Sequence, residues 1–190
     1  MKLSHSLLAI TMMVAAMPAL AHTGSHAASG FIHGFAHPFG GLDHTLAMVA
    51  VGLFAVVLGG RALWAVPTSF VSMMLPGGVI GFMGIRIPAI EMSIALSVVV
   101  FGAVLAAKIR CRISIAMMLT GVFAIFHGYA HGVEMPTEAA VGHYCLGFVS
   151  ATTLLHGTGL ALGIVLGNHQ MIHRVAGAGI GIAGVVLSLS

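Results

Sequence analysis

Residues 113–133 read ISIAMMLTGVFAIFHGYAHGV, a run that contains no Asp, Glu, Lys or Arg. A helix needs about 20 predominantly apolar residues to cross the hydrocarbon core of a bilayer, and this run has that length. Of the 190 residues in the chain, 59% are hydrophobic and 6% are charged, whereas soluble domains have about 25% charged residues. With a mean hydropathy of +1.11, this composition excludes a water-soluble globule and indicates a membrane protein.

Working outward from that run, the sequence predicts an all-α, polytopic membrane protein with one six-helix domain at residues 22–190. The expected transmembrane spans are about 42–59, 62–84, 88–107, 113–133, 139–167 and 174–189. Glycines four residues apart, such as Gly77 and Gly81 or Gly177 and Gly181, predict close helix packing within the bilayer.

Residues 1–21 have the features of a cleavable signal peptide. Lys2 precedes an apolar stretch from Leu7 to Met17, and Ala19-Leu20-Ala21 forms an A-x-A cleavage site. An uncleaved first span is disfavoured, because about eleven apolar residues are too few where roughly 20 are needed to cross. Cleavage would make His22 the mature N-terminus, outside the cytoplasm.

The distribution of charge supports the same orientation. With the mature N-terminus outside, five basic residues lie at the cytoplasmic joints and Arg86 alone lies outside, as the positive-inside rule requires. The five are Arg61, Lys108, Arg110, Arg112 and Arg174. Because these residues are dispersed, the isoelectric point near 9.3 does not indicate nucleic-acid binding. The two cysteines, Cys111 and Cys145, form no CxxC motif.

The chain contains 12 histidines, which is unusual for so apolar a composition. A first cluster of them lies in residues 33–44, HGFAHPFGGLDH. Pro38 suits the first turn of a helix and the two glycines allow a bend, so His37 and the Asp43-His44 pair are expected to converge. Imidazole and carboxylate suit Ni, Zn, Cu or Fe better than Ca or Mg. The alternative is that Asp43 caps the following helix while the histidines lie among lipid headgroups.

A second cluster lies at the outer end of the 113–133 span. His127, His131 and Glu134 have i, i+4, i+7 spacing, which places them on one helix face with Tyr129 pointing elsewhere. His143 opens the next span and is expected to face His127 and His131, because helices joined by a short loop are usually neighbours. The spacing differs from the H-E-x-x-H motif of zinc proteases.

Two further histidines are candidates. His156 lies in the middle of a span, where an ionisable residue is costly and faces the bundle interior by default. Its alternative is a neutral imidazole bonded to a neighbouring hydroxyl. His22 would combine a free α-amino group with an imidazole, a pair able to chelate one ion, unless it is only the first residue of a mobile tail. The full set of candidate metal-handling residues is His22, His33, His37, Asp43, His44, His127, His131, Glu134, His143 and His156.

The motifs together resemble a known family. The stretches are His37-Pro38-Phe39-Gly40-Gly41-Leu42-Asp43-His44, Phe126-His127-Gly128-Tyr129-Ala130-His131-Gly132-x-Glu134 and Ala151-Thr152-x-Leu154-Leu155-His156-x-x-Gly159. They resemble the HupE/UreJ family of hydrogenase and urease accessory membrane proteins, over nearly the whole mature chain. The resemblance implies nickel uptake across the bacterial inner membrane in support of nickel enzymes, with these histidine and acidic residues handling the metal.

The expected function is a permease for a divalent transition metal, above all Ni(II), with Co(II), Zn(II) and Cu(II) as competitors and no prosthetic group. Several weak sites suit transport, because a permeant ion must leave as well as enter. Besides the metal and the lipid bilayer, compatible partners are nickel-enzyme maturation proteins and further copies of the chain. The alternatives are an intramembrane zinc hydrolase using His127, His131 and a carboxylate, and a metal-binding or sensing subunit that does not transport.

Overall fold

The computed structural model describes residues 26–136, 140–167 and 169–189. These residues form seven α-helices and no strand. The helices are α2 (His26–Gly40), α3 (Leu42–Leu58), α4 (Ala62–Phe82), α5 (Ile90–Ala106), α6 (Ile113–Val133), α7 (Val141–Leu166) and α8 (Gln170–Ser188). The all-α fold is therefore confirmed for this part of the chain, and the expected signal peptide at 1–21 lies outside the described residues.

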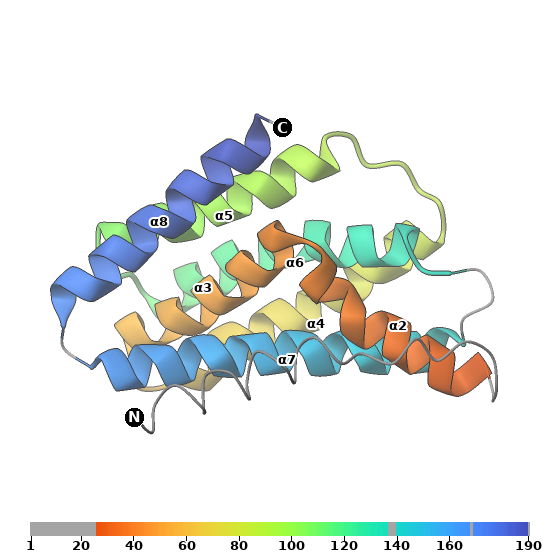
Figure 1. Ribbon diagram of the computed structural model, residues 1–190, viewed down its shortest axis with the longest axis horizontal. Helices are drawn as coiled ribbons and strands as arrows, with labels where there is room; N and C mark the ends of the chain where they lie inside the picture. The colour runs from red at the N-terminus through yellow and green to blue at the C-terminus, as the bar shows by residue number, and fades with distance from the viewer. Residues whose placement is uncertain (1–25, 137–139, 168, 190) are drawn as a thin grey trace, which may run out of the picture.

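The helices are arranged as three pairs around α3. α4 packs along α6, α5 along α8, and α2 along α7, while α3 contacts each of the other six described helices. Figure 1 shows α8 beside α5 along one edge of the molecule, α2 and α7 along the opposite edge, and α3 between them. Any residue at the start of α3 is consequently near the centre of one end of the bundle.

Glycine explains how the helix pairs approach so closely. A β-carbon on Gly77 of α4 would meet the backbone of Ile125 on α6, and one on Gly102 of α5 would meet the backbone of Gly181 on α8. Small residues at such positions let helix backbones touch where lipid provides no hydrophobic driving force. The packing role predicted for the spaced glycines of these helices is thereby confirmed.

Four helices are long and apolar enough to cross a membrane, namely α4, α6, α7 and residues Met171–Ser188 of α8. Residues Gly30–Gly40 and Leu42–Leu58 pass the same test together, as a pair bent by 84°, which raises the number to five. The apolar helix α5 has 17 residues and falls short of this test. The described residues therefore show four or five candidate spans, and the predicted six are not confirmed.

The expected span at 88–107 is shortened at its first turn. Pro88 has no backbone N–H, and Ala89 adopts a left-handed φ of 57°, a conformation that ends or interrupts a helix. Regular helix therefore begins only at Ile90.

Helix α2 was not expected in the Gly/His-rich segment. The position predicted for Pro38, in the first turn of a helix, is wrong, because Pro38 lies in the last turn of α2. The sequence supports this helix through Phe31, Phe35 and Phe39, whose rings contact one another at i, i+4 spacing with centroids 6.0 and 5.7 Å apart.

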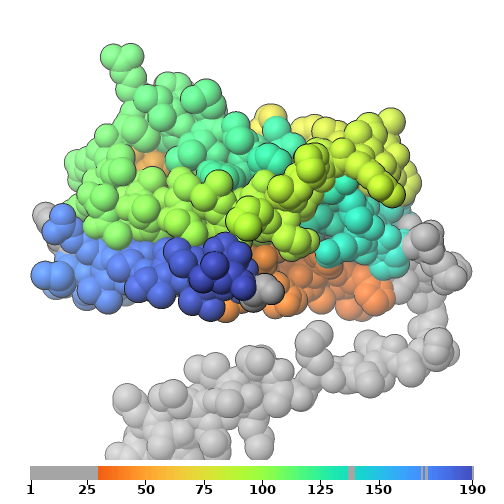
Figure 2. Space-filling model, turned by 90° about the horizontal axis from the view of Figure 1, so that it is seen from above, coloured from red at the N-terminus to blue at the C-terminus, as the bar shows by residue number. Residues whose placement is uncertain are grey.

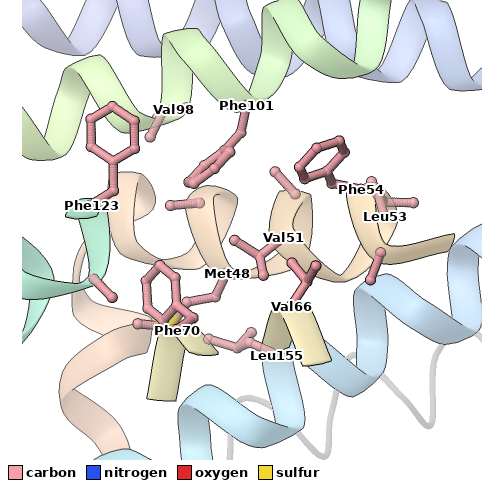
Figure 3. Packing of buried hydrophobic residues seen from close by; sticks show 14 of the residues in the cluster. Met48, Val51, Leu53, Phe54, Val66, Phe70, Val98, Phe101, Phe123 and Leu155 are labelled. Atoms are coloured by element: carbon pink, nitrogen blue, oxygen red, sulfur yellow. The ribbon is translucent and has the colours of Figure 1, made fainter. Parts of the chain in front are cut away.

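Apolar side chains fill the centre of the bundle and also cover its outside. Figure 3 shows the core, with Met48 and Val51 of α3, Phe70 of α4 and Leu155 of α7 in one cluster. Large apolar side chains such as Val165 nevertheless remain exposed on the surface, and Figure 2 shows the face that α5 and α8 present. A surface this apolar is stable in lipid rather than in water.

Candidate metal-handling site

The bend between α2 and α3 brings His37 close to the Asp43-His44 pair, with the ring centroids of His37 and His44 6.4 Å apart. The hydroxyl of Thr45 donates a hydrogen bond of 2.9 Å to the carbonyl of Pro38, which fixes the bend. Gly41 lies at the break, and a β-carbon there would be 2.5 Å from Asp43 Oδ1. A side chain at this position would therefore displace the carboxylate from its place beside His44.

Helix α6 adds two imidazoles to this group. The ring of His131 has its centroid 4.8 Å from that of His37 and 5.0 Å from that of His44. The ring of His127 lies 4.8 Å from that of His44. The structure thus brings together four imidazoles from three helices, which we call the imidazole row: His37, His44, His131 and His127.

Each of two carboxylates contacts one imidazole of the row. Glu134, which follows α6, has its Oε2 2.8 Å from the Nε2 of His37. Asp43 has its Oδ1 2.9 Å from the Nδ1 of His44 and also accepts the backbone N–H of that residue. A carboxylate that holds one ring nitrogen orients the other toward a metal, as in many metalloprotein sites. Asp43 is placed to orient His44 in this way.

Ser97 on α5 contacts the ring of His127, and sequence reasoning missed it. Its hydroxyl donates to the carbonyl of Ile94 at 2.6 Å and lies 2.9 Å from the Nε2 of His127. With the one hydroxyl hydrogen directed to the Ile94 carbonyl, His127 is the donor to Ser97, and its lone pair is then on Nδ1. A single serine in an apolar span gives no sequence signal beyond its polarity.

The same reasoning places the lone pair of His44 on Nε2, because the carboxylate of Asp43 can only accept a hydrogen bond. Within the described part of the chain, His127 Nδ1, His44 Nε2 and both ring nitrogens of His131 are buried without a hydrogen-bond partner. Such atoms are rare in folded proteins and call for a water, an ion or a functional role. Their chemistry is that of neutral imidazole ligands.

Exposure decreases along the row from the surface into the bundle. The side chains of Glu134 and His37 are 52% and 25% exposed, and that of His44 is 12% exposed. His127 and His131 are fully buried. The row therefore leads from a solvent-accessible rim to the interior.

His156 on α7 is also buried but is separated from the row. The ring of Phe70 contacts a histidine on each side of this division, with its centroid 5.5 Å from that of His127 and 5.1 Å from that of His156. Among the described residues neither ring nitrogen of His156 has a partner. The hydroxyl of Thr152, one turn away, points to the sulfur of Met74 at 3.8 Å instead, so the expected alternative of a hydroxyl-bonded imidazole is not observed there.

The structure does not bring the remaining candidates into the row. His143 is exposed, with its β-carbon beside Gly30 of α2, so the prediction that it faces His127 and His131 is wrong. The reason is that α7 packs along α2 and α3, while α6 packs along α4. Tyr144 is turned inward instead, with its ring 6.2 Å from that of His37.

His33 is exposed on α2, and His22 lies outside the described residues. Residues 33–37, HGFAH, and 127–131, HGYAH, have the same pattern of His, Gly, aromatic residue, Ala and His, but they share a packing feature more than a ligand set. Gly34 and Gly128 would each carry a β-carbon into the backbone of a neighbouring helix, at Tyr144 and Met74 respectively. Only the second motif contributes both of its histidines to the row.

The geometry is that of successive imidazoles rather than a closed cage. Neighbouring rings meet edge-on, with interplanar angles of 66° to 83° along the row. No three His, Cys, Asp or Glu side chains among the described residues surround a single point where an ion would be held. The arrangement offers one or two nitrogen ligands at each step.

Comparison with known proteins identifies the family. The profile of the HupE / UreJ protein family matches residues 10–187. Protein HupE of Rhizobium leguminosarum bv. viciae is 41% identical over 189 residues, which cover 97% of this chain and 98% of that protein. No solved structure matches the chain. The chain therefore belongs to the HupE/UreJ family.

Proposed function

We propose that this protein is a permease that carries a divalent transition metal, above all Ni(II), across the bacterial inner membrane toward nickel-enzyme maturation. The observation that carries the proposal is the imidazole row, whose buried nitrogens lack partners within the described residues. A transition metal supplies the partner that these nitrogens need, and imidazole suits Ni, Co, Zn and Cu.

The decrease in side-chain exposure along the imidazole row gives the order in which the ion contacts its residues. The carboxylate of Glu134 and the ring of His37 form the rim, where a negative charge raises the local concentration of cations. The ion then passes to His44 and His131 and onward to His127, with rotation of the rings presenting one or two nitrogens at a time. Weak successive sites of this kind allow an ion to enter and also to leave.

The topology belongs to the proposal. We place six spans in the membrane, with the α2–α3 pair as a broken first span and α5 as a short third span. The connections between spans that carry basic residues then face the cytoplasm, namely those at Arg61, at Lys108, Arg110 and Arg112, and at Arg174. In this orientation the rim faces outward, beside an N-terminal segment that starts at His22 once residues 1–21 are removed.

A metal-dependent hydrolase is a weaker proposal. Such an enzyme holds its ion with three firm ligands and leaves one position open. No such group of ligands is found in the described residues. A subunit that binds metal without moving it shares the same ligands, so only flux separates it from a permease.

The test is uptake of radiolabelled Ni(II) by proteoliposomes that contain only this protein. We expect saturable uptake above that of empty liposomes, unchanged by excess Mg(II) and reduced by Co(II). His44→Ala should abolish most of it, whereas His169→Ala, at an exposed residue before α8, should not. Metal binding without flux would leave only the binding subunit, and competition by Mg(II) equal to that by Co(II) would contradict imidazole ligation.

A further inference from the structure

We propose that Phe70 is the gate of the transport path, a side chain that closes the passage between the imidazole row and His156. This inference rests on the proposed function and adds to it a residue with no ligand atom. Phe70 contacts both His127, the innermost imidazole of the row, and His156, a buried imidazole outside the row.

Phe70 is fully buried on α4, and its ring contacts both His127 of α6 and His156 of α7. The ring meets that of His156 at an interplanar angle of 87° and that of His127 at 54°. In the described residues no ring contact joins His127 directly to His156, so Phe70 is the side chain that bridges them.

The surroundings of Phe70 are apolar. Met48 and Val51 of α3, Val66 of α4 and Leu155 of α7 share its core cluster, and Figure 3 shows Met48 and Leu155 beside its ring with Val51 and Val66 farther along the core. A metal ion that leaves His127 on this side therefore meets apolar side chains that offer it no nitrogen or oxygen ligand atom. An apolar constriction of this kind blocks ions because they would have to lose their ligands without replacement.

The helix that carries the ring contains two prolines. Pro67 and Pro76 both lie inside α4, on either side of Phe70. Each removes a backbone donor and weakens the helix locally, which allows bending in a transmembrane helix. The ring is therefore carried by the part of α4 best able to shift, and its displacement would open the passage.

A core residue with no role in gating would be equally buried, and Phe101 on α5 provides that comparison. It is also fully buried, but its ring contacts Phe123, at 5.5 Å. Phe101→Ala removes the same volume from the core as Phe70→Ala. It therefore controls for loss of packing, and Phe70→Leu keeps an apolar side chain of intermediate size.

The experiment measures access to a thiol on each side of the ring, independently of metal flux. In a Cys111→Ser, Cys145→Ser background, a thiol is introduced by His127→Cys or by His156→Cys. Ag(I), a thiol-reactive cation small enough to follow the buried imidazoles, is then added outside proteoliposomes of outward-facing protein, and the thiols that remain free are counted with a maleimide after denaturation. The modification rate is compared for Phe70, Phe70→Leu, Phe70→Ala and Phe101→Ala.

We expect the thiol at position 127 to react in every form. The thiol at position 156 should react at least about tenfold faster with Phe70→Ala than with Phe70 or Phe101→Ala, and Phe70→Leu should be intermediate. Equal rates at 156 with and without the ring, or a thiol at 127 that never reacts, would overturn the gate. If the gate behaves as expected but Ni(II) flux is absent, the proposed function fails and the gate stands.

Discussion

The Nε2 of His37 on α2 lies 2.8 Å from the Oε2 of Glu134, the residue that follows α6. This contact joins the two histidine motifs of the chain at the exposed end of the imidazole row. It places a negative charge at the mouth of a row of imidazoles that continues inward to His127. The other acidic residue of the site, Asp43, contacts His44 and is 21% exposed, against 52% for Glu134, so the two carboxylates act at different depths.

Glu134→Gln should raise the KM for Ni(II) by about tenfold with little change in maximal rate, because the charge at the rim concentrates cations before they reach a ligand. Initial uptake rates over a range of Ni(II) concentrations give both constants. The matched control is Glu91→Gln, which removes an exposed carboxylate in the first turn of α5. Equal effects of the two substitutions would show that only total charge matters.

Gly41→Ala should reduce uptake by about tenfold or more, since a β-carbon there would lie 2.5 Å from Asp43 Oδ1 and would displace the carboxylate that orients His44. The neighbouring Gly40→Ala is the control, because a β-carbon at Gly40 would meet nothing within 4 Å. Both variants are compared for uptake and for amount inserted. Normal uptake by Gly41→Ala would remove the orienting role of Asp43.

Ser97→Ala should lower uptake by about tenfold, because His127 then loses the acceptor that keeps its lone pair on Nδ1. Ser97→Thr retains a hydroxyl and should restore much of the rate. Ser93→Ala, four residues earlier, removes an exposed hydroxyl that bonds only its own helix and should have no effect. Failure of threonine to rescue would indicate that Ser97 matters only for packing.

The sequence predicts those parts of the site that depend on local spacing. His127 and His131 share a helix face because they are four residues apart, and Asp43 reaches His44 because they are adjacent. The pairing of helices depends on which glycines meet which backbones, and no local pattern contains that information. This is why His143 was expected at the site and Tyr144 is found there.

Two further features are beyond sequence reasoning for the same reason. Ser97 and Phe70 lie in apolar runs and belong to no motif. Each is assigned a role only because the structure places it against a histidine of another helix. The bend at Gly41 was expected from the two glycines. The helix before it was not, because glycine, histidine and proline are poor helix formers and only packing against α7 offsets their low propensity.

The orientation predicts which loops a thiol reagent can reach. In a Cys145→Ser background, a membrane-impermeant maleimide should fail to label Cys111 in intact cells and should label it after permeabilisation. Cys111 lies between α5 and α6, at a joint rich in basic residues that the positive-inside rule places in the cytoplasm. Labelling in sealed cells would reverse the topology and place the rim inside.

The central claim is that metal crosses this protein along the imidazole row. The most direct measurement is Ni(II) uptake by proteoliposomes containing the double variant His127→Ala, His131→Ala, compared at equal protein with the unchanged chain. These two buried side chains hold most of the unpartnered nitrogens of the row, and no other imidazole of the row comes from α6. The account predicts that uptake falls to the level of empty liposomes while the variant remains inserted. Near-normal uptake by the double variant would contradict it.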